Sequence, residues 1–318
     1  MTAPAIVCVS ANPAIDRRLR LPTLGLGRIN RAISAEALPG GKAAHVALSA
    51  RALGATTAWL GFLGGAAGQE FVERFAQFDI ELLRVSISES TRTNLELLED
   101  SGEITEVLEP GARPSPGETT EMLRWFEVCL RGKWRGALVV ISGSLPPGVS
   151  VRLYRSLITS AKSAGSRVFL DTSGEALRAS LSSRPAFVKP NREEVETLLR
   201  RRLISRAAIV DGAKELIRRG AKSAAVSLGS EGLVWVERKN GPVWFAQPPR
   251  LKSISTVGCG DATVAGFAFA MAEGLQGEKA IRLATACGAA NCIAKYPGRI
   301  SRKHVRSLML RVKIHEIS

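Results

Sequence analysis

One stretch near the end of the chain organises the rest, Ser255-Thr256-Val257-Gly258-Cys259-Gly260-Asp261-Ala262-Thr263, and it continues through small apolar residues to Ala270. Two glycines, an aspartate and then a run without proline or charge predict a tight loop that opens into a buried helix. The first amides of such a helix lack backbone partners, and with the helix dipole they form a site for an anion such as phosphate. Asp261 lies where that dipole favours its carboxylate form, so it can accept a proton beside the anion. The stretch indicates phosphoryl transfer, although glycine-led helix starts are also common where nothing is bound.

This loop fits neither of two familiar nucleotide-binding motifs. Thr263 stands where the dinucleotide fingerprint Gly-x-Gly-x-x-Gly needs its last glycine, and the loop comes late in the chain rather than after the first strand. No Gly-x-x-x-x-Gly-Lys-Ser/Thr occurs in the sequence, so a P-loop is excluded.

The composition is that of a soluble α/β protein with an excess of basic residues. The chain has 318 residues, of which 45% are hydrophobic and 5% aromatic, enough for one large core. Lys and Arg number 44 against 29 Asp and Glu, a net charge of +15. The basic residues are scattered over expected helix surfaces with little aromatic interleaving. A solvated basic face is therefore favoured over nucleic-acid binding, and an anionic small substrate comes next.

The five cysteines indicate neither a zinc site nor a disulfide scaffold, because they lack paired short spacings and high density. We interpret Cys8, Cys129, Cys259, Cys287 and Cys292 as reduced core thiols. The first residues lack a charged leader region, and no apolar run approaches the roughly 20 residues of a membrane span. We expect a cytoplasmic protein without a membrane partner.

Strand and helix patterns alternate along most of the chain. Short apolar runs predict buried strands at 5–10, 56–63, 136–142, 167–170, 187–188 and 224–227, and a hairpin at 233–236 and 243–245. Helices are predicted at 43–54, 117–131, 151–164, 192–202, 212–219, 261–273, 277–294 and 301–312. This order predicts an α/β fold with a largely parallel sheet covered by helices on both faces, and a single domain over 1–318.

Two segments break this pattern and predict a small separate sheet. Residues 17–37 alternate apolar and polar types, as do residues 84–109, where 93–98 and 103–108 form a hairpin with one polar face. Together they predict a β-sheet lid outside the main body.

Four further residues are candidates for ligand contacts. Asp16 follows the first strand, where open α/β sheets bind ligands, although an Asx-type turn explains it equally well. Lys42 follows a second glycine-led helix start, where its ammonium can meet a phosphate. His45 lies one turn further on, and a structural hydrogen-bonded histidine is the preferred interpretation. Arg92 precedes the lid hairpin and can reach an anionic ligand, with a surface arginine as the alternative.

Seven short motifs run in order along the chain: Asn12-Pro13-Ala14-Ile15-Asp16, Pro39-Gly40-Gly41-Lys42, Thr91-Arg92-Thr93-Asn94, Ile141-Ser142-Gly143-Ser144-Leu145-Pro146, Val188-Lys189-Pro190-Asn191-Arg192-Glu193-Glu194, Val226-Ser227-Leu228-Gly229 and Thr256-Val257-Gly258-Cys259-Gly260-Asp261. In this order they resemble the ribokinase-like sugar kinases, the phosphofructokinase B family, almost from end to end. One such motif is weak evidence, whereas seven in order are strong.

The resemblance implies an ATP-dependent transfer of the γ-phosphoryl group to a sugar hydroxyl, with Mg²⁺ bridging the phosphates and K⁺ as a further candidate ion. Asp261 matches the catalytic base, and the amides of Gly258, Cys259 and Gly260 match the anion hole. Glu194 matches the acidic residue that organises Mg²⁺. The nucleotide set is Lys189, Asn191, Ser227, Gly229, Gly232 and Thr256. The substrate set is Asp16, Gly40, Gly41, Lys42, His45, Arg92 and Ser142. The lid matches the family's β-clasp, which implies a homodimer through the lid.

The chain departs from the family pattern at three positions. The family has Gly-Gly-Lys-Gly-x-Asn, whereas here Ala43 replaces the last glycine and His45 the asparagine. An imidazole in the sugar pocket can alter which hexose is taken or, when protonated, add a phosphate ligand. Cys259 replaces the usual alanine between the loop glycines, which preserves the turn but can make the enzyme sensitive to thiol reagents.

Lys42 and Arg92, as two cations beside Asp16, suit an acceptor that already carries a phosphate. The closest family members are hexose-phosphate kinases, and we expect fructose 6-phosphate, giving fructose 1,6-bisphosphate, ahead of fructose 1-phosphate or tagatose 6-phosphate. A ribokinase-like kinase of a free sugar or nucleoside is the alternative. From a different class comes a non-catalytic binder of an anionic ligand or nucleic acid.

Overall fold

Two sheets organise the structure, a computed structural model in which residues 3–317 are described. The large sheet has ten strands in the order β14 (Lys313–Ile317), β13 (Val243–Gln247), β12 (Leu233–Val236), β11 (Ala224–Ser227), β10 (Phe187–Val188), β9 (Val168–Asp171), β8 (Leu138–Ser142), β1 (Ala5–Ser10), β4 (Thr56–Leu63) and β5 (Glu81–Ser86). All neighbours from β5 to β11 pair in parallel, and β12, β13 and β14 add an antiparallel edge. The predicted, largely parallel sheet is confirmed.

The first strand marks a change of direction in this sheet. β1 pairs with β4 on one side and β8 on the other, so the chain builds the sheet outward from β1 in both directions. The carboxyl ends of strands at such a switch point border a crevice, where open α/β sheets bind their ligands. The candidate residues should therefore meet at this end of the sheet.

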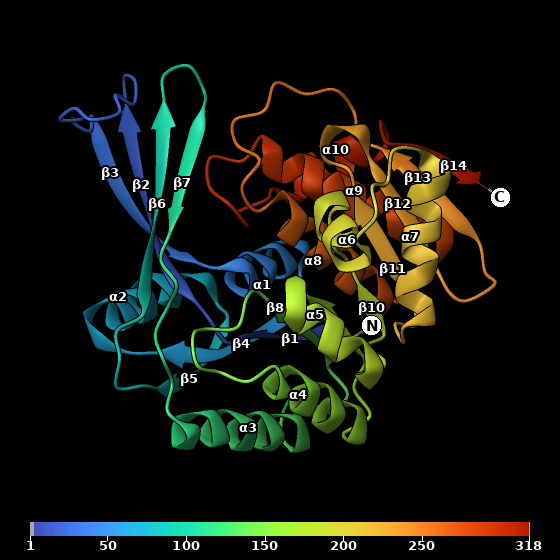
Figure 1. Ribbon diagram of the computed structural model, residues 1–318, viewed down its shortest axis with the longest axis horizontal. Helices are drawn as coiled ribbons and strands as arrows, with labels where there is room; N and C mark the ends of the chain where they lie inside the picture. Colours follow the sequence, from blue (N-terminus) through green and yellow to red (C-terminus); the bar gives the residue numbers. More distant parts are fainter. Residues whose placement is uncertain (1–2, 318) are drawn as a thin grey trace.

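Helices cover both faces, as predicted (Figure 1). Side chains of β1 alternate, with Ile6 and Cys8 in one core cluster and Val7 and Val9 in the other. The first face carries α1 (Lys42–Leu53), α2 (Gly65–Phe75), α8 (Cys259–Ala272), α9 (Gly277–Cys292) and α10 (Arg302–Met309). The second carries α3 (Pro116–Arg131), α4 (Arg152–Ser163), α5 (Gly174–Ser180), α6 (Arg192–Leu199) and α7 (Arg206–Arg218).

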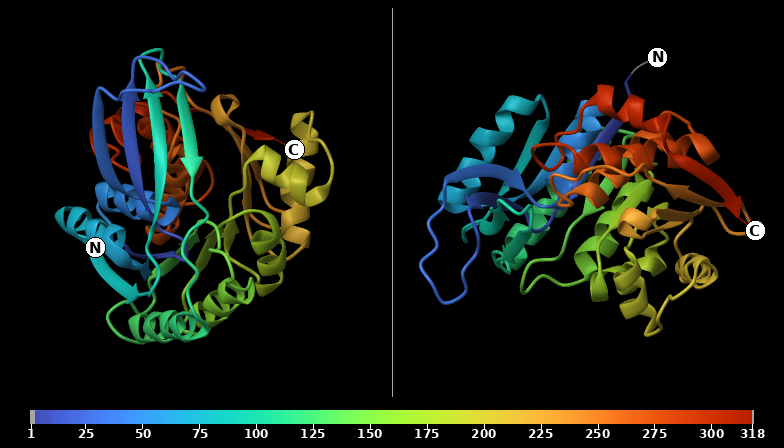
Figure 2. Two further views of the ribbon diagram at one scale, coloured as in Figure 1. Left: turned by 60° about the vertical axis from the view of Figure 1, so that its left-hand side comes forward. Right: turned by 90° about the horizontal axis from the view of Figure 1, so that it is seen from above.

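The small sheet stands away from the body as the expected lid (Figure 2). Its strands are β3 (Ser34–Gly40), β2 (Ala14–Leu21), β6 (Arg92–Glu99) and β7 (Ile104–Leu108), in that order. β2 pairs in parallel with β6, while the outer pairs are antiparallel. Residues 84–86, which we assigned to the lid, belong to β5 at the edge of the large sheet. The second lid segment therefore begins at Arg92.

Arg18 connects the lid to the body and also forms a buried ion pair within the lid. Arg18 on β2 and Glu96 on β6 lie opposite each other, with Arg18 Nη2 at 2.6 Å from Glu96 Oε2. Arg18 Nη1 donates a hydrogen bond of 2.5 Å to the carbonyl of Lys295, which follows α9. Removing one partner of a buried pair typically costs about 3–5 kcal/mol, so Glu96 fixes the position of the Arg18 side chain that reaches the body.

Some elements were not predicted. The glycine-rich start of α2 suggests a loop, but Phe71 and Phe75 pack on Trp59 with ring centroids 4.7 and 5.8 Å apart, and this packing stabilises the helix. α7 begins at Arg206 rather than at residue 212, because Ser205 caps it by accepting a hydrogen bond from the amide of Ala208. The short helix α5 and the edge strand β14 were also missed. No helix within residues 3–317 is long and apolar enough to cross a membrane.

Candidate active site

The glycine-led loop opens into α8 as predicted. Gly258 is the N-cap of the helix with a φ of 77°, a conformation that favours glycine, and a Cβ there would lie 3.0 Å from the side chain of Pro297. Asp261 follows in the first turn of α8 and is 6% exposed. The loop thus places the amides of Gly260 and Asp261 and a carboxylate at one helix end, while the amide of Cys259 donates to the carbonyl of Thr256 at 3.2 Å.

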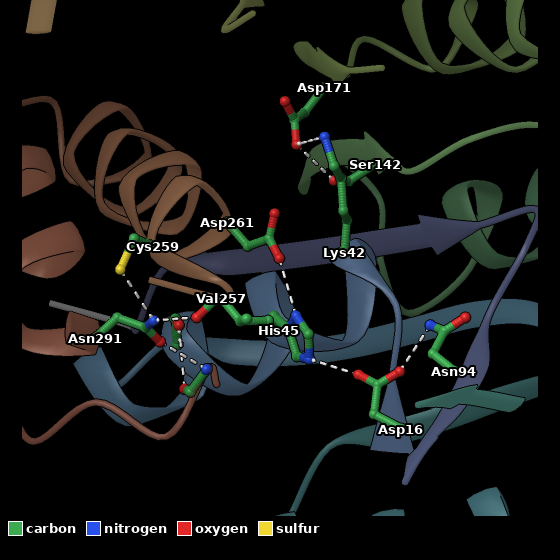
Figure 3. A network of polar contacts seen from close by, with 12 residues as sticks. Asp16, Lys42, His45, Asn94, Ser142, Asp171, Val257, Cys259, Asp261 and Asn291 are labelled. Carbon is green, nitrogen blue, oxygen red and sulfur yellow. Dashed lines mark hydrogen bonds and ion pairs between the residues drawn. The ribbon is translucent and has the colours of Figure 1, made fainter. Parts of the chain in front are cut away.

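His45 joins two carboxylates that are far apart in the sequence (Figure 3). Its Nδ1 lies 2.9 Å from Asp261 Oδ2, and its Nε2 lies 3.4 Å from Asp16 Oδ2. Asp16 Oδ1 accepts a hydrogen bond of 2.8 Å from Asn94 Nδ2. Asp16 fits only because residue 40 is glycine, since a Cβ at Gly40 would lie 2.1 Å from Asp16 Cγ. We call Asp16, His45, Asp261 and Asn94 the carboxylate group.

The imidazole of His45 is held in its charged form. Burial alone would lower the pKa of His45, but the hydrogen bonds to Asp16 and Asp261 outweigh burial and raise the pKa to about 10. Both ring nitrogens then donate, one to each carboxylate. His45 is therefore the hydrogen-bonded histidine that we expected, and its partners are the two acidic candidates of the site.

A second polar cluster lies across the cleft around Asp171, at the end of β9. Lys42 Nζ lies 3.6 Å from Asp171 Oδ2, and Lys189 Nζ lies 3.9 Å from Oδ1. Ser142 donates a hydrogen bond of 3.0 Å to Asp171 Oδ2. Burial pushes the pKa of Asp171 upward, but Lys42, Lys189 and Ser142 outweigh it and lower the pKa below its usual range. We call Asp171, Lys42, Lys189 and Ser142 the lysine group.

Glu194 borders the lysine group from the start of α6. Its Oε2 accepts a hydrogen bond from the amide of Asn191, and Asn191 Oδ1 accepts one from the amide of Glu194, which is a capping box. The other oxygen of Glu194 lies 4.0 Å from Lys42 Nζ. One carboxylate oxygen therefore organises the helix start while the other faces the cleft.

The predicted nucleotide-binding residues lie at the end of a strand or in loops that follow strands or precede helices. A Cβ at Gly260 would lie 3.3 Å from Lys189 Nζ, so the lysine reaches the amides at the start of α8. Asn191 pairs with Ser227 through an isolated β-bridge. Gly229 and Gly232 flank the turn after β11, and Thr256 is an exposed residue of the loop before α8. Five of the six nucleotide candidates thus lie at or just after the ends of β10 and β11, whereas Thr256 lies in the loop before α8.

Arg92 and Lys42 do not lie together, although we expected both beside Asp16. Lys42 pairs with Asp171 and Glu194, whereas Arg92 donates to the carbonyls of Glu109 and Asn12 at 2.8 and 3.1 Å. The reason is that Lys42 extends from the start of α1 toward β9, while Arg92 begins lid strand β6. The two cations therefore serve different parts of the cleft.

Three buried polar atoms of this cleft have no hydrogen-bond partner within residues 3–317. They are Arg92 Nε, Asn94 Oδ1 and Asp171 Oδ1. Buried polar atoms are nearly always paired in folded proteins, so a cluster of unpaired ones in a cleft points to a bound ligand.

Sequence reasoning missed Asp171 and Asn94. Asp171 stands directly after a buried strand, the same signal that singled out Asp16, and Asn94 belongs to a quoted motif but received no role. The interpretation of all five cysteines as core thiols is also wrong for two of them. Cys259 and Cys292 are partly exposed, and their sulfur atoms lie 2.9 Å apart.

Comparison with known proteins identifies the family. Residues 6–302 match the pfkB family of carbohydrate kinases. The chain belongs to this family. It is therefore a carbohydrate kinase, a phosphotransferase with an alcohol group as acceptor, as the seven motifs predicted.

Individual relatives agree with this assignment. The 1-phosphofructokinase of Xanthomonas campestris pv. campestris is 36% identical over 314 residues, 97% of each chain. The 1-phosphofructokinase of Escherichia coli K12 is 31% identical over 313 residues, again 97% of each chain. Among solved structures, phosphofructokinase-2 from Escherichia coli in complex with potassium has a TM-score of 0.88 at 30% identity, covering 98% of this chain and 99% of that chain. The same protein in complex with fructose-6-phosphate has a TM-score of 0.86. The ribokinase-like fold is thus confirmed.

Proposed function

We propose that this pfkB kinase transfers the γ-phosphoryl group of ATP to a hydroxyl of a phosphorylated hexose, and that fructose 1-phosphate is its preferred acceptor. The observation that carries the reaction is the position of Asp261, which belongs to the carboxylate group, faces the lysine group and lies at the start of a glycine-led helix (Figure 3). The sequence placed fructose 6-phosphate first. Relatives named 1-phosphofructokinase, 36% and 31% identical over 97% of the chain, move fructose 1-phosphate ahead of it.

Asp261 acts as the base in this proposal. Its Oδ2 is occupied by His45, so its Oδ1 remains to accept the proton of the acceptor hydroxyl. Phosphoryl transfer passes through a loose transition state that needs little base strength, and an ordinary carboxylate suffices. His45 orients this carboxylate by holding one of its oxygens.

The lysine group and the loop amides stabilise the charge that develops on the transferred phosphoryl group. Lys42 and Lys189 bring two ammonium groups to the single carboxylate of Asp171, so the lysine group carries one positive charge in excess. Positioned cations and backbone amides are the main source of rate in phosphoryl transfer. Lys189 lies beside Gly260, so the lysine and the helix start can contact the same phosphate.

In this proposal the lid strands bind the acceptor. Asp16 on β2 accepts hydrogen bonds from sugar hydroxyls, and the unpaired Oδ1 of Asn94 on β6 accepts another. Arg92 Nε is a buried donor without a partner in the part of the chain that is described, and the existing phosphate of the acceptor would satisfy it. The acceptor thus lies between the lid and His45.

The position of Glu194 fits a Mg²⁺ ion that both this carboxylate and the nucleotide phosphates would hold. Mg²⁺ in kinases usually takes one or two carboxylates plus phosphate oxygens and water rather than a complete protein cage. Within residues 3–317 no three acidic, histidine or cysteine side chains form such a cage, and Glu194 offers one oxygen toward the cleft. When held there by Glu194 and the nucleotide, Mg²⁺ would neutralise negative charge on the phosphates of ATP. K⁺ is a second candidate ion, and comparing activity in K⁺ and Na⁺ tests it.

We further propose that residues 1–318 form one kinase domain and that two copies associate through their lids. The lid carries exposed apolar side chains, with Ile33 at 57%, Val107 at 51% and Leu108 at 59% exposure. Sedimentation of wild type and Val107→Lys tests the dimer, which the lysine should dissociate.

The acceptor is tested by measuring ADP release with fructose 1-phosphate, fructose 6-phosphate, tagatose 6-phosphate, fructose and ribose. We expect the highest kcat/KM with fructose 1-phosphate. Fructose 6-phosphate is the second candidate, because Escherichia coli phosphofructokinase-2, 30% identical, is solved in complex with that sugar. Faster turnover of unphosphorylated sugars would overturn the acceptor proposal. DNA binding that weakens steeply with salt, without ATP turnover, would favour a non-catalytic binder.

A further inference from the structure

The loop that carries the anion-binding amides also carries one of two cysteines in contact. Cys259 Sγ lies 2.9 Å from Cys292 Sγ, and both side chains are partly exposed. Cys259 is the first residue of α8, between the two loop glycines, and Cys292 is the last residue of α9. We propose that Cys259 and Cys292 are a modification site that forms a reversible disulfide and thereby switches the kinase off. Only the effect on activity rests on the proposed function.

Backbone contacts hold the two cysteines side by side. The amides of Ile254 and Ser255 donate to the carbonyl of Cys292 at 2.7 and 3.3 Å, so the segment before α8 folds back onto the end of α9. A disulfide bond here joins two segments that are already adjacent, and it needs no large rearrangement of the backbone.

Asn291 adds a second connection at the same place (Figure 3). Its Nδ2 donates to the carbonyl of Val257 at 2.7 Å and contacts Cys259 Sγ at 3.4 Å, while its Oδ1 accepts from the amide of Gly298 at 2.8 Å. The anion-binding loop is therefore anchored through the residue next to Cys292. A movement of Cys292 is transmitted to this loop.

The other three cysteines are unsuited to oxidation. Cys8 and Cys287 are fully buried, Cys129 is 8% exposed, and burial raises the pKa of each thiol. In the pair, the hydrogen bond with Cys259 lowers the pKa of Cys292 below its ordinary value. Because the thiolate is the reactive form, Cys292 is the cysteine that reacts first with an oxidant.

A peroxide is the class of oxidant that completes the reaction. The Cys292 thiolate attacks one peroxide oxygen, the O–O bond breaks, and the sulfenic acid of Cys292 forms with release of water or an alcohol. The Cys259 sulfur then attacks this sulfenic sulfur, the S–O bond breaks, and a second water leaves as the S–S bond forms. Two thiols lose two electrons and the peroxide gains them. A dithiol reverses the step by thiol–disulfide exchange.

The disulfide must displace the loop. A disulfide has an S–S distance of about 2.05 Å, so the two sulfur atoms, now 2.9 Å apart, must move roughly 1 Å closer together. Cys259 is the first residue of α8, so a shift of Cys259 also moves the amides at the start of this helix, two residues before Asp261. Misplacing reacting groups by about 1 Å can cost about 10²-fold in rate.

The test combines a chemical and a kinetic readout on the full chain. Wild type, Cys292→Ser and Cys129→Ser are treated with hydrogen peroxide, alkylated and digested, and ADP release is measured in parallel. We expect wild type and Cys129→Ser to yield a peptide joined through Cys259 and Cys292, with an intact mass lower by about 2 Da. We expect their activity to fall at least about 10-fold and to return with dithiothreitol. Cys292→Ser should keep its activity and form no such link.

Each other result overturns a defined part of the proposal. Absence of the joined peptide in wild type removes the modification site. A joined peptide with unchanged turnover removes the control of activity, and equal inactivation of wild type and Cys292→Ser assigns inactivation to another residue. If Cys292→Ser does not fold by circular dichroism, Cys292→Ala replaces it. A reduced chain that turns over no sugar phosphate but still forms the link refutes the proposed function and leaves the site intact.

Discussion

The two polar groups of the cleft are built from similar parts but carry opposite charge. The carboxylate group holds one imidazolium between Asp16 and Asp261, so negative charge is in excess. The lysine group holds Asp171 between Lys42 and Lys189, so positive charge is in excess. Each buried charge is paired, which limits the cost of burial, and each group keeps one charge for a ligand.

This difference divides the work of the site. Excess negative charge suits hydroxyl groups and a departing proton, while excess positive charge suits phosphates. Asp261 belongs to the carboxylate group and faces the lysine group (Figure 3). A single carboxylate therefore lies where both requirements meet. Variants on the two sides should fail in different ways, and this separates them experimentally.

Asp261→Asn should have the largest effect. Loss of the proton acceptor should lower kcat by about 10²-fold or more, as for other general bases, while nucleotide affinity stays within a few-fold. Single-turnover kinetics and a nucleotide titration by fluorescence measure the two quantities. Turnover close to that of wild type would remove Asp261 from its role.

His45→Asn should change how stability depends on pH. Native His45 keeps its proton up to about pH 10, whereas the unfolded chain releases it near the ordinary value of 6.5. The native state therefore binds more protons between these values. The stabilisation from His45 is full below about 6.5 and is lost as the pH rises through about 10.

Urea unfolding between pH 6 and pH 10 measures this effect. Wild type should lose on the order of a few kcal/mol more unfolding free energy over this interval than His45→Asn. The matched control is His304→Asn, which replaces an exposed histidine and should follow the wild-type curve. Parallel curves for His45→Asn and wild type would mean that the imidazole is neutral.

Lys42→Met tests the lysine group. Loss of one charge-assisted bond to phosphate should lower kcat by about 10- to 100-fold, since such bonds contribute about 1.5–3 kcal/mol. KM for the sugar should change little, because Lys42 faces Asp171 rather than Asp16. Steady-state kinetics with the control Lys162→Met, an exposed lysine, measures this. A rise in sugar KM at constant kcat would place Lys42 on the acceptor side instead.

Arg92→Lys should have the smallest effect. Lysine keeps the charge but loses the guanidinium fork, so KM for a phosphorylated acceptor should rise about 3- to 10-fold while KM for ATP is unchanged. The same change measured with unphosphorylated fructose should be absent. Equal effects on both sugars would mean that Arg92 acts only through the carbonyls of Asn12 and Glu109.

The sequence was most informative where a local pattern carries the signal. Glycines before a helix located Gly258 and Asp261, alternation of apolar and polar residues located the lid, and short apolar runs located the parallel strands. Helix α2 was missed because its stability comes from packing on Trp59, a contact that composition does not reveal. The side-chain contacts of His45 and Cys259 were missed for the same reason. Tertiary packing of distant segments places His45 between Asp16 and Asp261 and brings Cys259 into contact with Cys292.

Two of the attachments that lid strand β2 makes to the body have a consequence for exchanging lids between relatives. Asp16 contacts His45 on α1, and Arg18, two residues along the same strand, binds the carbonyl of Lys295 after α9. On the body, the first attachment uses the side chain of His45, whereas the second uses only the backbone carbonyl of Lys295. A transplanted lid would therefore be compatible with many residues at position 295, but it would need a matching residue at position 45. In the proposed acceptor site, the lid and residue 45 of α1 would therefore set the acceptor preference together.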